Sequence, residues 1–168
     1  MLDDILDAAV NAINTAGISA FREFPERRAD LKSGASVSVG ADSCKCLSSG
    51  LGEYLGTRVA SDGGEDVELF GRRLELELRF EIYSPFGAAY GAAGCLRCAD
   101  SLRECFGALP SGLKALDMEC GEIKADEELS CYRCSCVLHT LAFLVAESTS
   151  GETKFLDFVL KGTVDSGN

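Results

Sequence analysis

The chain has 168 residues and a mass of 17.8 kDa, enough to bury the core of one domain. With 46% hydrophobic and 26% charged residues, its composition is that of a folded globular protein and excludes a disordered one. The formal net charge of −11 opposes nonspecific binding to nucleic acid or anionic lipid, because such binding needs clustered lysine and arginine. We therefore expect no specific nucleic-acid binding and no membrane contact.

The first ten residues, MLDDILDAAV, are acidic and lack the basic start and apolar run of a signal peptide. The most apolar run, 137–146, is too short to span a membrane. The expected compartment is therefore the cytosol, where thiols stay reduced. The nine cysteines are an odd number, so they cannot form a complete disulfide framework within one chain.

The first half of the chain predicts one helix and two short strands. Residues 2–16 place apolar side chains at helical spacing, with two aspartates in the first turn and Gly17 as a stop. Strands are expected over 18–24 and 35–40. Residues 41–66 are rich in Gly, Ser and Asp, which predicts a long loop that contacts a partner.

The clearest strand spans 74–83, where apolar and polar side chains alternate, and Ser84-Pro85 ends it. One face carries the apolar set Leu74, Leu76, Leu78, Phe80 and Ile82, and the other the polar set Glu75, Glu77, Arg79, Glu81 and Tyr83. Upstream, the apolar residues fall on the opposite parity, which predicts a bulge or turn that absorbs one position at Phe70–Gly71.

The second half predicts a helix over 87–109, beginning near Tyr90, and three further strands. These strands are expected over 115–123, 129–147 and 155–164, and the first two are joined by a turn at 125–128. The whole indicates an α+β domain over 1–164, followed by a loose tail, 165–168. We expect an antiparallel or mixed sheet of about five to six strands with two helices packed on one face.

The cysteines include two Cys-x-x-Cys pairs, 95/98 and 131/134, a spacing found in zinc sites. The predicted structure favours another interpretation. Cys95, Cys98 and Cys105 fall on the core-facing stripe of the helix, and Cys120 continues the alternation of Leu116 and Met118. On the late strand, 131 and 134 point to opposite faces, whereas 134, 136 and 138 share one. We therefore interpret the cysteines as small buried apolar residues and predict no metal site.

Spacing alone leaves open whether a metal is bound by any of five cysteines, namely Cys44, Cys46, Cys131, Cys134 and Cys136. His139 is the only histidine, and its strand position indicates a partly solvated structural role. The segment GAAYGAAG, 87–94, lacks the spacing of a dinucleotide fingerprint, and SGLGEYLGTR, 49–58, lacks the lysine of a P-loop. We predict no catalytic residue, no cofactor and no enzymatic activity.

Three stretches carry a resemblance to a known family: MLDDILDAAVNAINTAGI, LFGRRLELELRFEIYSPFGAAYGAAGC, and GEIKADEELSCYRCSCVLHTLAFLVAE followed by FLDFVLKG. In their order and pattern they resemble the tail-terminator (tail-completion) proteins of long-tailed bacteriophages and prophages. The resemblance implies a ring, expected to be a hexamer, that caps the tail tube, stops its polymerisation and joins it to the head-side connector. It implies no cofactor, and assembly in the bacterial cytoplasm before incorporation into the virion tail.

A ring needs two different surfaces on each subunit. The residues expected to contact neighbours or partners are Tyr54, Arg58, Phe86 and Tyr90, and the acidic residues expected to face the lumen are Glu75, Glu77 and Glu81. Two other functions stay open. A head–tail neck or minor capsid protein would bind heads rather than isolated tails, and a cysteine-rich zinc-binding adaptor domain would contain metal.

Overall fold

A computed structural model describes residues 2–23, 34–58, 67–87, 89–105 and 113–148 of the chain. It contains two α-helices and a mixed sheet of seven strands, so the predicted α+β class is confirmed, with more strands than expected. In chain order, the elements are α1 (Leu2–Thr15), β1 (Ser19–Arg22), β2 (Ser36–Ser48), the 3-10 helix η1 (Leu51–Glu53), β3 (Tyr54–Arg58), β4 (Val67–Pro85), α2 (Gly91–Cys105), β5 (Leu113–Cys120), β6 (Lys124–Asp126) and β7 (Cys131–Ser148).

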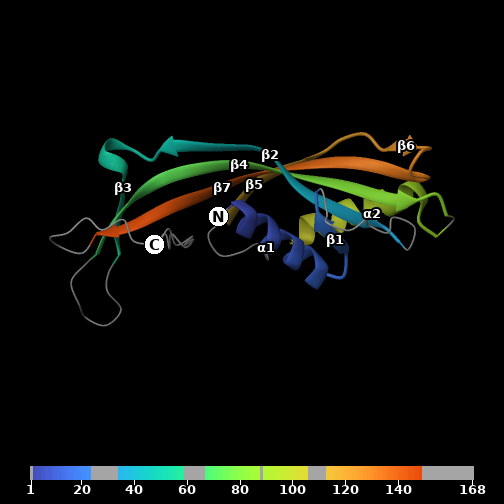
Figure 1. Cartoon of the computed structure of the whole chain (residues 1–168), viewed down its shortest axis with the longest axis horizontal. Helices are drawn as coiled ribbons and strands as arrows, with labels where there is room; N and C mark the ends of the chain where they lie inside the picture. Colours follow the sequence, from blue (N-terminus) through green and yellow to red (C-terminus); the bar gives the residue numbers. More distant parts are fainter. Residues whose placement is uncertain (1, 24–33, 59–66, 88, 106–112, 149–168) are drawn as a thin grey trace.

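The sheet is organised around two long strands, β4 with 19 residues and β7 with 18. They pair antiparallel from Glu68–Ser148 to Pro85–Cys131 without a register shift. The strand order is β1-β2-β4-β7-β5, with β3 paired to the start of β4 and β6 to the start of β7. Short strands β3 and β6 therefore lie at opposite ends of the sheet (Figure 1). Among the described pairs, β1 with β2 is parallel and the others are antiparallel.

Both helices lie on one face of the sheet (Figure 1), as predicted. Each helix turns an apolar stripe toward the strands, and the alternation of β4 supplies the opposing surface. The buried side chains meet in one apolar cluster, which contains Ile5, Leu6, Ala9 and Ile13 of α1, Cys95, Cys98, Ala99 and Leu102 of α2, and Leu74, Leu76, Leu78, Phe80 and Ile82 of β4. The face assignment made from the sequence of β4 is confirmed.

A small residue lets α2 approach β4 closely. A Cβ atom placed on Gly94 would overlap the hydroxyl oxygen of Ser84, which is fully buried. The Ser84 hydroxyl donates a hydrogen bond of 2.7 Å to the carbonyl of Gly91, the first residue of the helix. The glycine-rich segment before and within α2 therefore serves the contact between helix and strand.

The predicted loop over 41–66 is wrong for most of its length. Residues 41–48 continue β2, and η1 and β3 occupy 51–58, while 59–66 lie outside the described residues. The part of β2 beyond β1 pairs with β4 on one side only, and many of its side chains are exposed. Such an edge strand does not need the apolar alternation by which strands are recognised in sequence.

The predicted bulge at Gly71 is also wrong, because β4 pairs with β7 through this residue without a shift. The register shifts among the described pairs lie in other strands: β2 inserts Asp42 and β3 inserts Leu55 opposite β4, and β5 inserts Leu116 opposite β7. Gly71 allows a close approach instead, since a Cβ atom there would overlap the carbonyl oxygen of Leu144. Leu116 is 55% exposed and does not continue the alternation of Cys120.

Several predicted features cannot be compared with the structure. The expected strand 155–164, the tail 165–168 and the last turn of the predicted second helix, 106–109, lie outside the described residues. Among the described helices, none combines the length and apolar character needed to cross a membrane.

Candidate interface on the open face of the sheet

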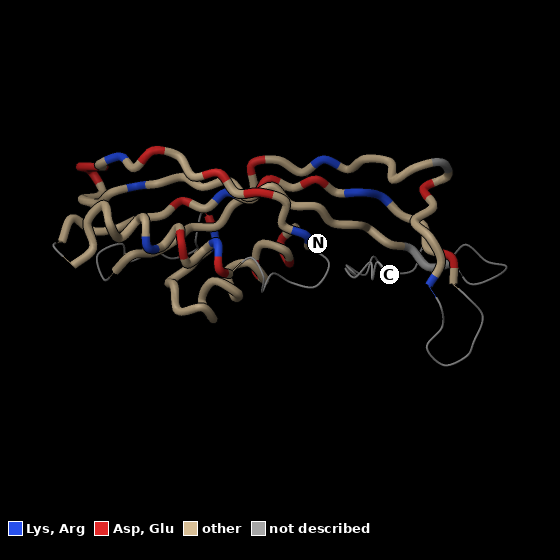
Figure 2. Tube along the Cα trace, turned by 180° about the vertical axis from the view of Figure 1, so that it is seen from behind, with Lys and Arg blue, Asp and Glu red and all other residues tan. Residues whose placement is uncertain are grey.

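The sheet face opposite the helices carries the polar side chains of β4 and its neighbours, and we refer to it as the open face. None of the described helices packs on it. Direct cross-strand partners extend the polar rows from β4 onto β2 and β7, for example Ser43–Glu77–His139 and Ser38–Glu81–Ser135. Acidic and basic residues are interspersed along these strands (Figure 2). One face of β4 is exposed to solvent and the other is covered, which explains why polar and apolar side chains alternate so strictly along this strand.

Arg79 links three strands across the open face. Its guanidinium bonds to the carboxylate of Glu23, directly after β1, and lies 2.7 Å from an Asp42 carboxylate oxygen in β2. Asp42 falls at the register shift of β2, where one extra residue lets its side chain turn toward Arg79. Both carboxylates therefore hold Arg79 in place, with the guanidinium about one-third exposed.

Arg133 of β7, the register partner of Tyr83, is held by a second pair of carboxylates on the open face. Its guanidinium lies 3.3 Å from carboxylate oxygens of both Glu81 and Asp126. The same group lies over the ring of Tyr83, 5.7 Å from its centroid, within cation–π range. Hydrogen bonds from the Leu129 backbone amide and from Arg133 lower the pKa of Asp126. This network joins β4, β6 and β7.

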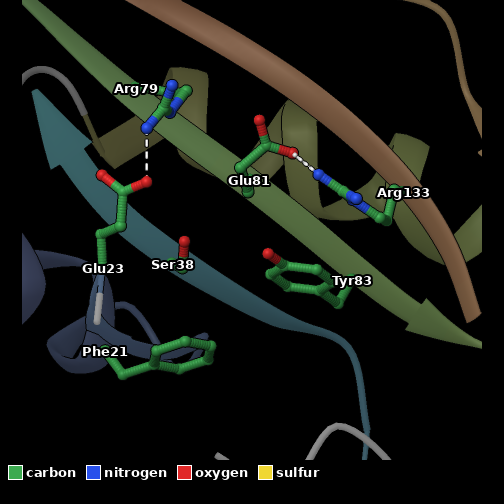
Figure 3. A pocket seen from close by; sticks show the side chains of 7 residues that line it. All are labelled: Phe21, Glu23, Ser38, Arg79, Glu81, Tyr83 and Arg133. Atoms are coloured by element: carbon green, nitrogen blue, oxygen red, sulfur yellow. Dashed lines mark hydrogen bonds and ion pairs between the residues drawn. The ribbon is translucent and has the colours of Figure 1, made fainter. Parts of the chain in front are cut away.

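A shallow depression of about 390 Å³ lies between these two networks (Figure 3). Tyr83 lines it and stacks with Phe21 of β1 at a ring-centroid separation of 6.5 Å, while burial raises the pKa of Tyr83. The lining residues are Phe21, Glu23, Ser38, Arg79, Glu81, Tyr83 and Arg133. Their charges are already paired with one another, and small-ligand sites are usually deeper and more apolar. The depression therefore suits contact with a polar macromolecular surface.

The three acidic residues predicted to face a lumen do share the open face. Each lies near a positive or titratable nitrogen: Glu75 is 2.9 Å from Arg73, Glu81 is bonded to Arg133, and Glu77 is 3.8 Å from His139. The other ring nitrogen of His139 lies 3.8 Å from Asp117 of β5. The partners on other strands, Arg133 and His139, could not be found from the sequence pattern of β4, because they depend on the register between β4 and β7.

The residues predicted as contacts form two separate patches. Tyr54 and Arg58 lie on β3, beside the start of β4, whereas Phe86 and Tyr90 follow its end. A 19-residue strand spans about 60 Å, so the patches lie at opposite ends of the sheet. Tyr54, Phe86 and Tyr90 are 44%, 44% and 38% exposed. We call Tyr54 and Arg58 the β3 patch, and Phe86 and Tyr90 the Phe86 patch.

Each patch is supported by an aromatic pair. Tyr54 packs edge-on against Phe70 of β4, with ring centroids 5.6 Å apart, and Phe86 packs edge-on against Tyr132 of β7 at 5.0 Å. The supporting rings belong to the two central strands, so each exposed aromatic is anchored to the most regular part of the sheet. Such amphipathic, anchored aromatics are typical of protein interfaces.

The cysteines divide into buried and exposed groups. Those of α2 and β7 are buried, namely Cys95, Cys98, Cys105, Cys131, Cys134 and Cys136, and Cys120 is half-buried. Cys95, Cys98, Cys134 and Cys136 belong to the apolar cluster, as predicted, while Cys105 and Cys131 are buried outside it. Burial raises the pKa of the Cys95 thiol to about 11, which fits a protonated core side chain. The prediction is wrong for Cys44 and Cys46, which are exposed on the edge strand β2.

No three metal-ligating side chains converge within the described part of the chain. Cys44 pairs with Leu76 on one side of β4, whereas Cys136 pairs with Phe80 on the other. Four residues of strand length separate these positions by about 13 Å, too far for ligands of one zinc ion.

A comparison with known protein families finds no family whose model matches this chain, and a comparison with characterised proteins finds no similar sequence. Membership of a known family is therefore not shown.

Proposed function

We propose that the protein is a non-enzymatic structural component of a phage or prophage tail. It acts as a tail terminator: a ring, expected to be a hexamer, that caps the tail tube, stops its polymerisation and joins it to the head-side connector. It assembles in the bacterial cytoplasm and ends in the virion tail. The observation that carries this proposal is the presence of two anchored, exposed aromatic patches at opposite ends of one long sheet.

A ring closes when one surface of a subunit binds a different surface of the next. The β3 patch and the Phe86 patch differ in composition and are held apart by the β4–β7 ladder. A rigid ladder fixes the separation and angle between two such surfaces, which determine how many subunits close a ring. Both patches also have the exposed aromatic residues that contribute most to binding energy at protein interfaces.

The open face suits a wall that DNA passes without being retained. Arg79 and Arg133 are each held by two carboxylates, so they contribute little attraction for phosphate groups. The remaining carboxylates and the net charge of −11 oppose binding of a polyanion. The lumen assignment of Glu75, Glu77 and Glu81 is part of this proposal.

The test uses tail tubes from the phage or prophage whose genome encodes this chain, produced with the gene deleted and supplied in trans. We expect the deletion to give overlong tubes without heads, and the wild-type gene to restore uniform length in electron micrographs. Tyr54→Ala and Phe86→Ala should each fail to restore it. Leu96→Ala is the matched control, because Leu96 is 59% exposed on α2 and belongs to neither patch.

Each variant is first checked for wild-type thermal unfolding, so that loss of fold is not mistaken for loss of contact. Normal tubes in the deletion strain would contradict the proposal. Protein found on filled heads instead of tails would assign it to the neck or capsid. Stoichiometric zinc, lost together with the fold on chelation, would identify an adaptor domain instead.

A further inference from the structure

Two cysteines from neighbouring strands face one another directly. Cys120, the last residue of β5, is the register partner of Cys136 in β7. Their sulfur atoms lie 2.8 Å apart, and the Cys136 thiol donates to the Cys120 sulfur. A third sulfur, that of Cys134, lies within hydrogen-bonding range of Cys136. Direct contact between two free thiols is the first requirement for joining them.

The backbone around this pair is suited to a disulfide. The Gly121 amide donates a hydrogen bond of 2.8 Å to the Ser135 carbonyl, so the next pair along the ladder is a hydrogen-bonded one. Pairs alternate along an antiparallel ladder, which makes Cys120 and Cys136 a non-hydrogen-bonded pair with Cα atoms about 4.5 Å apart. Disulfides bridge Cα separations of about 4.4–6.8 Å, so no large backbone movement is needed.

The two thiols differ in access. Cys120 is half-buried at the end of an edge strand, whereas Cys136 has no exposed surface. A dissolved oxidant therefore reaches Cys120 first, and Cys136 lies behind it as the resolving thiol. The exposed cysteines Cys44 and Cys46 offer no comparable arrangement, because they are two residues apart on one strand and do not face each other.

We propose that Cys120 and Cys136 form a reversible dithiol site that is oxidised to an intrachain disulfide by small-molecule disulfides such as oxidised glutathione. The Cys120 thiolate attacks the sulfur–sulfur bond, forms a mixed disulfide and releases one glutathione thiolate. The Cys136 thiolate then attacks the Cys120 sulfur and expels the second glutathione. The two protein thiols lose two protons and two electrons, and oxidised glutathione is reduced to two molecules of glutathione.

Burial raises the pKa of Cys136, so its thiolate is scarce at neutral pH. The second step is therefore slow at pH 7, and its rate should increase at pH 8.5.

The disulfide would link β5 to β7 covalently at one end of the sheet. It closes the segment 120–136, which contains β6 and the turn before β7. That turn contacts the Phe86 patch, because the Phe86 amide donates to the carbonyl of Ser130. Oxidation would therefore stiffen the surroundings of Phe86. This inference stands independently of the proposed tail function.

The experiment incubates purified full-length protein with oxidised glutathione at pH 7 and 8.5 and counts free thiols in denaturant. We expect a fall from nine to seven, faster at the higher pH. After alkylation and tryptic cleavage, a disulfide should join peptide 115–124 to peptide 134–154, and fragmentation should assign it to Cys136 rather than Cys134.

Cys120→Ser should abolish the disulfide, and it alters only the half-buried partner, so the fold is expected to survive. Cys105→Ser is the matched control, because Cys105 is buried on a different element, α2, and this variant should still lose two thiols. Retention of all nine thiols, a stable glutathione adduct on Cys120, or a bond from Cys134 would each overturn the proposal.

Discussion

The two faces of the sheet receive side chains from alternate residues of β4, yet they are stabilised differently. The covered face packs leucine, phenylalanine and cysteine into one apolar cluster beneath two helices. The open face carries charges held in cross-strand pairs and is partly exposed. Burial of apolar area dominates folding energy, whereas exposed ion pairs contribute little. The covered face therefore determines stability, and the open face is available for contacts.

The largest expected effect comes from truncating the covered face. Phe80→Ala should lower the free energy of unfolding by about 3–5 kcal/mol, because Phe80 is 1% exposed and its loss leaves a cavity. Arg79→Ala, the adjacent residue on the open face, should cost less than about 1 kcal/mol. Denaturant unfolding of both variants tests the comparison, and equal losses would show that the two faces contribute alike.

A second prediction concerns the contact between α2 and β4. Gly94→Ala should destabilise the protein by about 1–2 kcal/mol, since overlap with the Ser84 hydroxyl outweighs the better helix propensity of alanine. In the double variant with Ser84→Ala, the combined loss should be smaller than the sum of the two single losses. Strict additivity in thermal or denaturant unfolding would exclude a direct clash.

One buried and one exposed cysteine allow the contribution of burial to stability to be compared for the same residue type. Cys98→Ser should cost about 1–2 kcal/mol, because it places a hydroxyl group in the apolar cluster. Cys44→Ser on the exposed part of β2 should change stability by less than about 0.5 kcal/mol. If chemical denaturation gives the reverse order, the burial of these two thiols is wrongly assigned.

The smallest effect is expected on the open face, from Asp126. Its pKa is lowered in the folded protein, so its contribution is complete above the pKa of an unfolded aspartate, about 4, and is lost as the pH falls below that value. Asp126→Asn should therefore be less stable than wild type at pH 7, with the difference shrinking toward pH 2. Thermal midpoints measured across this range test the sign, and a constant difference would contradict it.

How much of this fold the sequence predicts depends on whether the signal is local. The alternation of β4, the stripe of α1 and the cysteine stripe of α2 are local patterns that burial imposes, and each predicted the correct face. The outer part of β2 was missed because an exposed edge strand imposes no such pattern. The partners of Arg79 and Arg133 could not be predicted, because they depend on the register between strands distant in sequence.

The pairing of β4 with β7 has a consequence for the order of folding. Pro85 pairs with Cys131, 46 residues later, whereas Glu68 pairs with Ser148, 80 residues later. Closing the shorter loop loses less chain entropy, so the ladder is expected to nucleate beside the α2 end and to zip toward β3. The end that carries Tyr54 would then be assembled last and open first, and amide hydrogen exchange should be faster there than at Ile82.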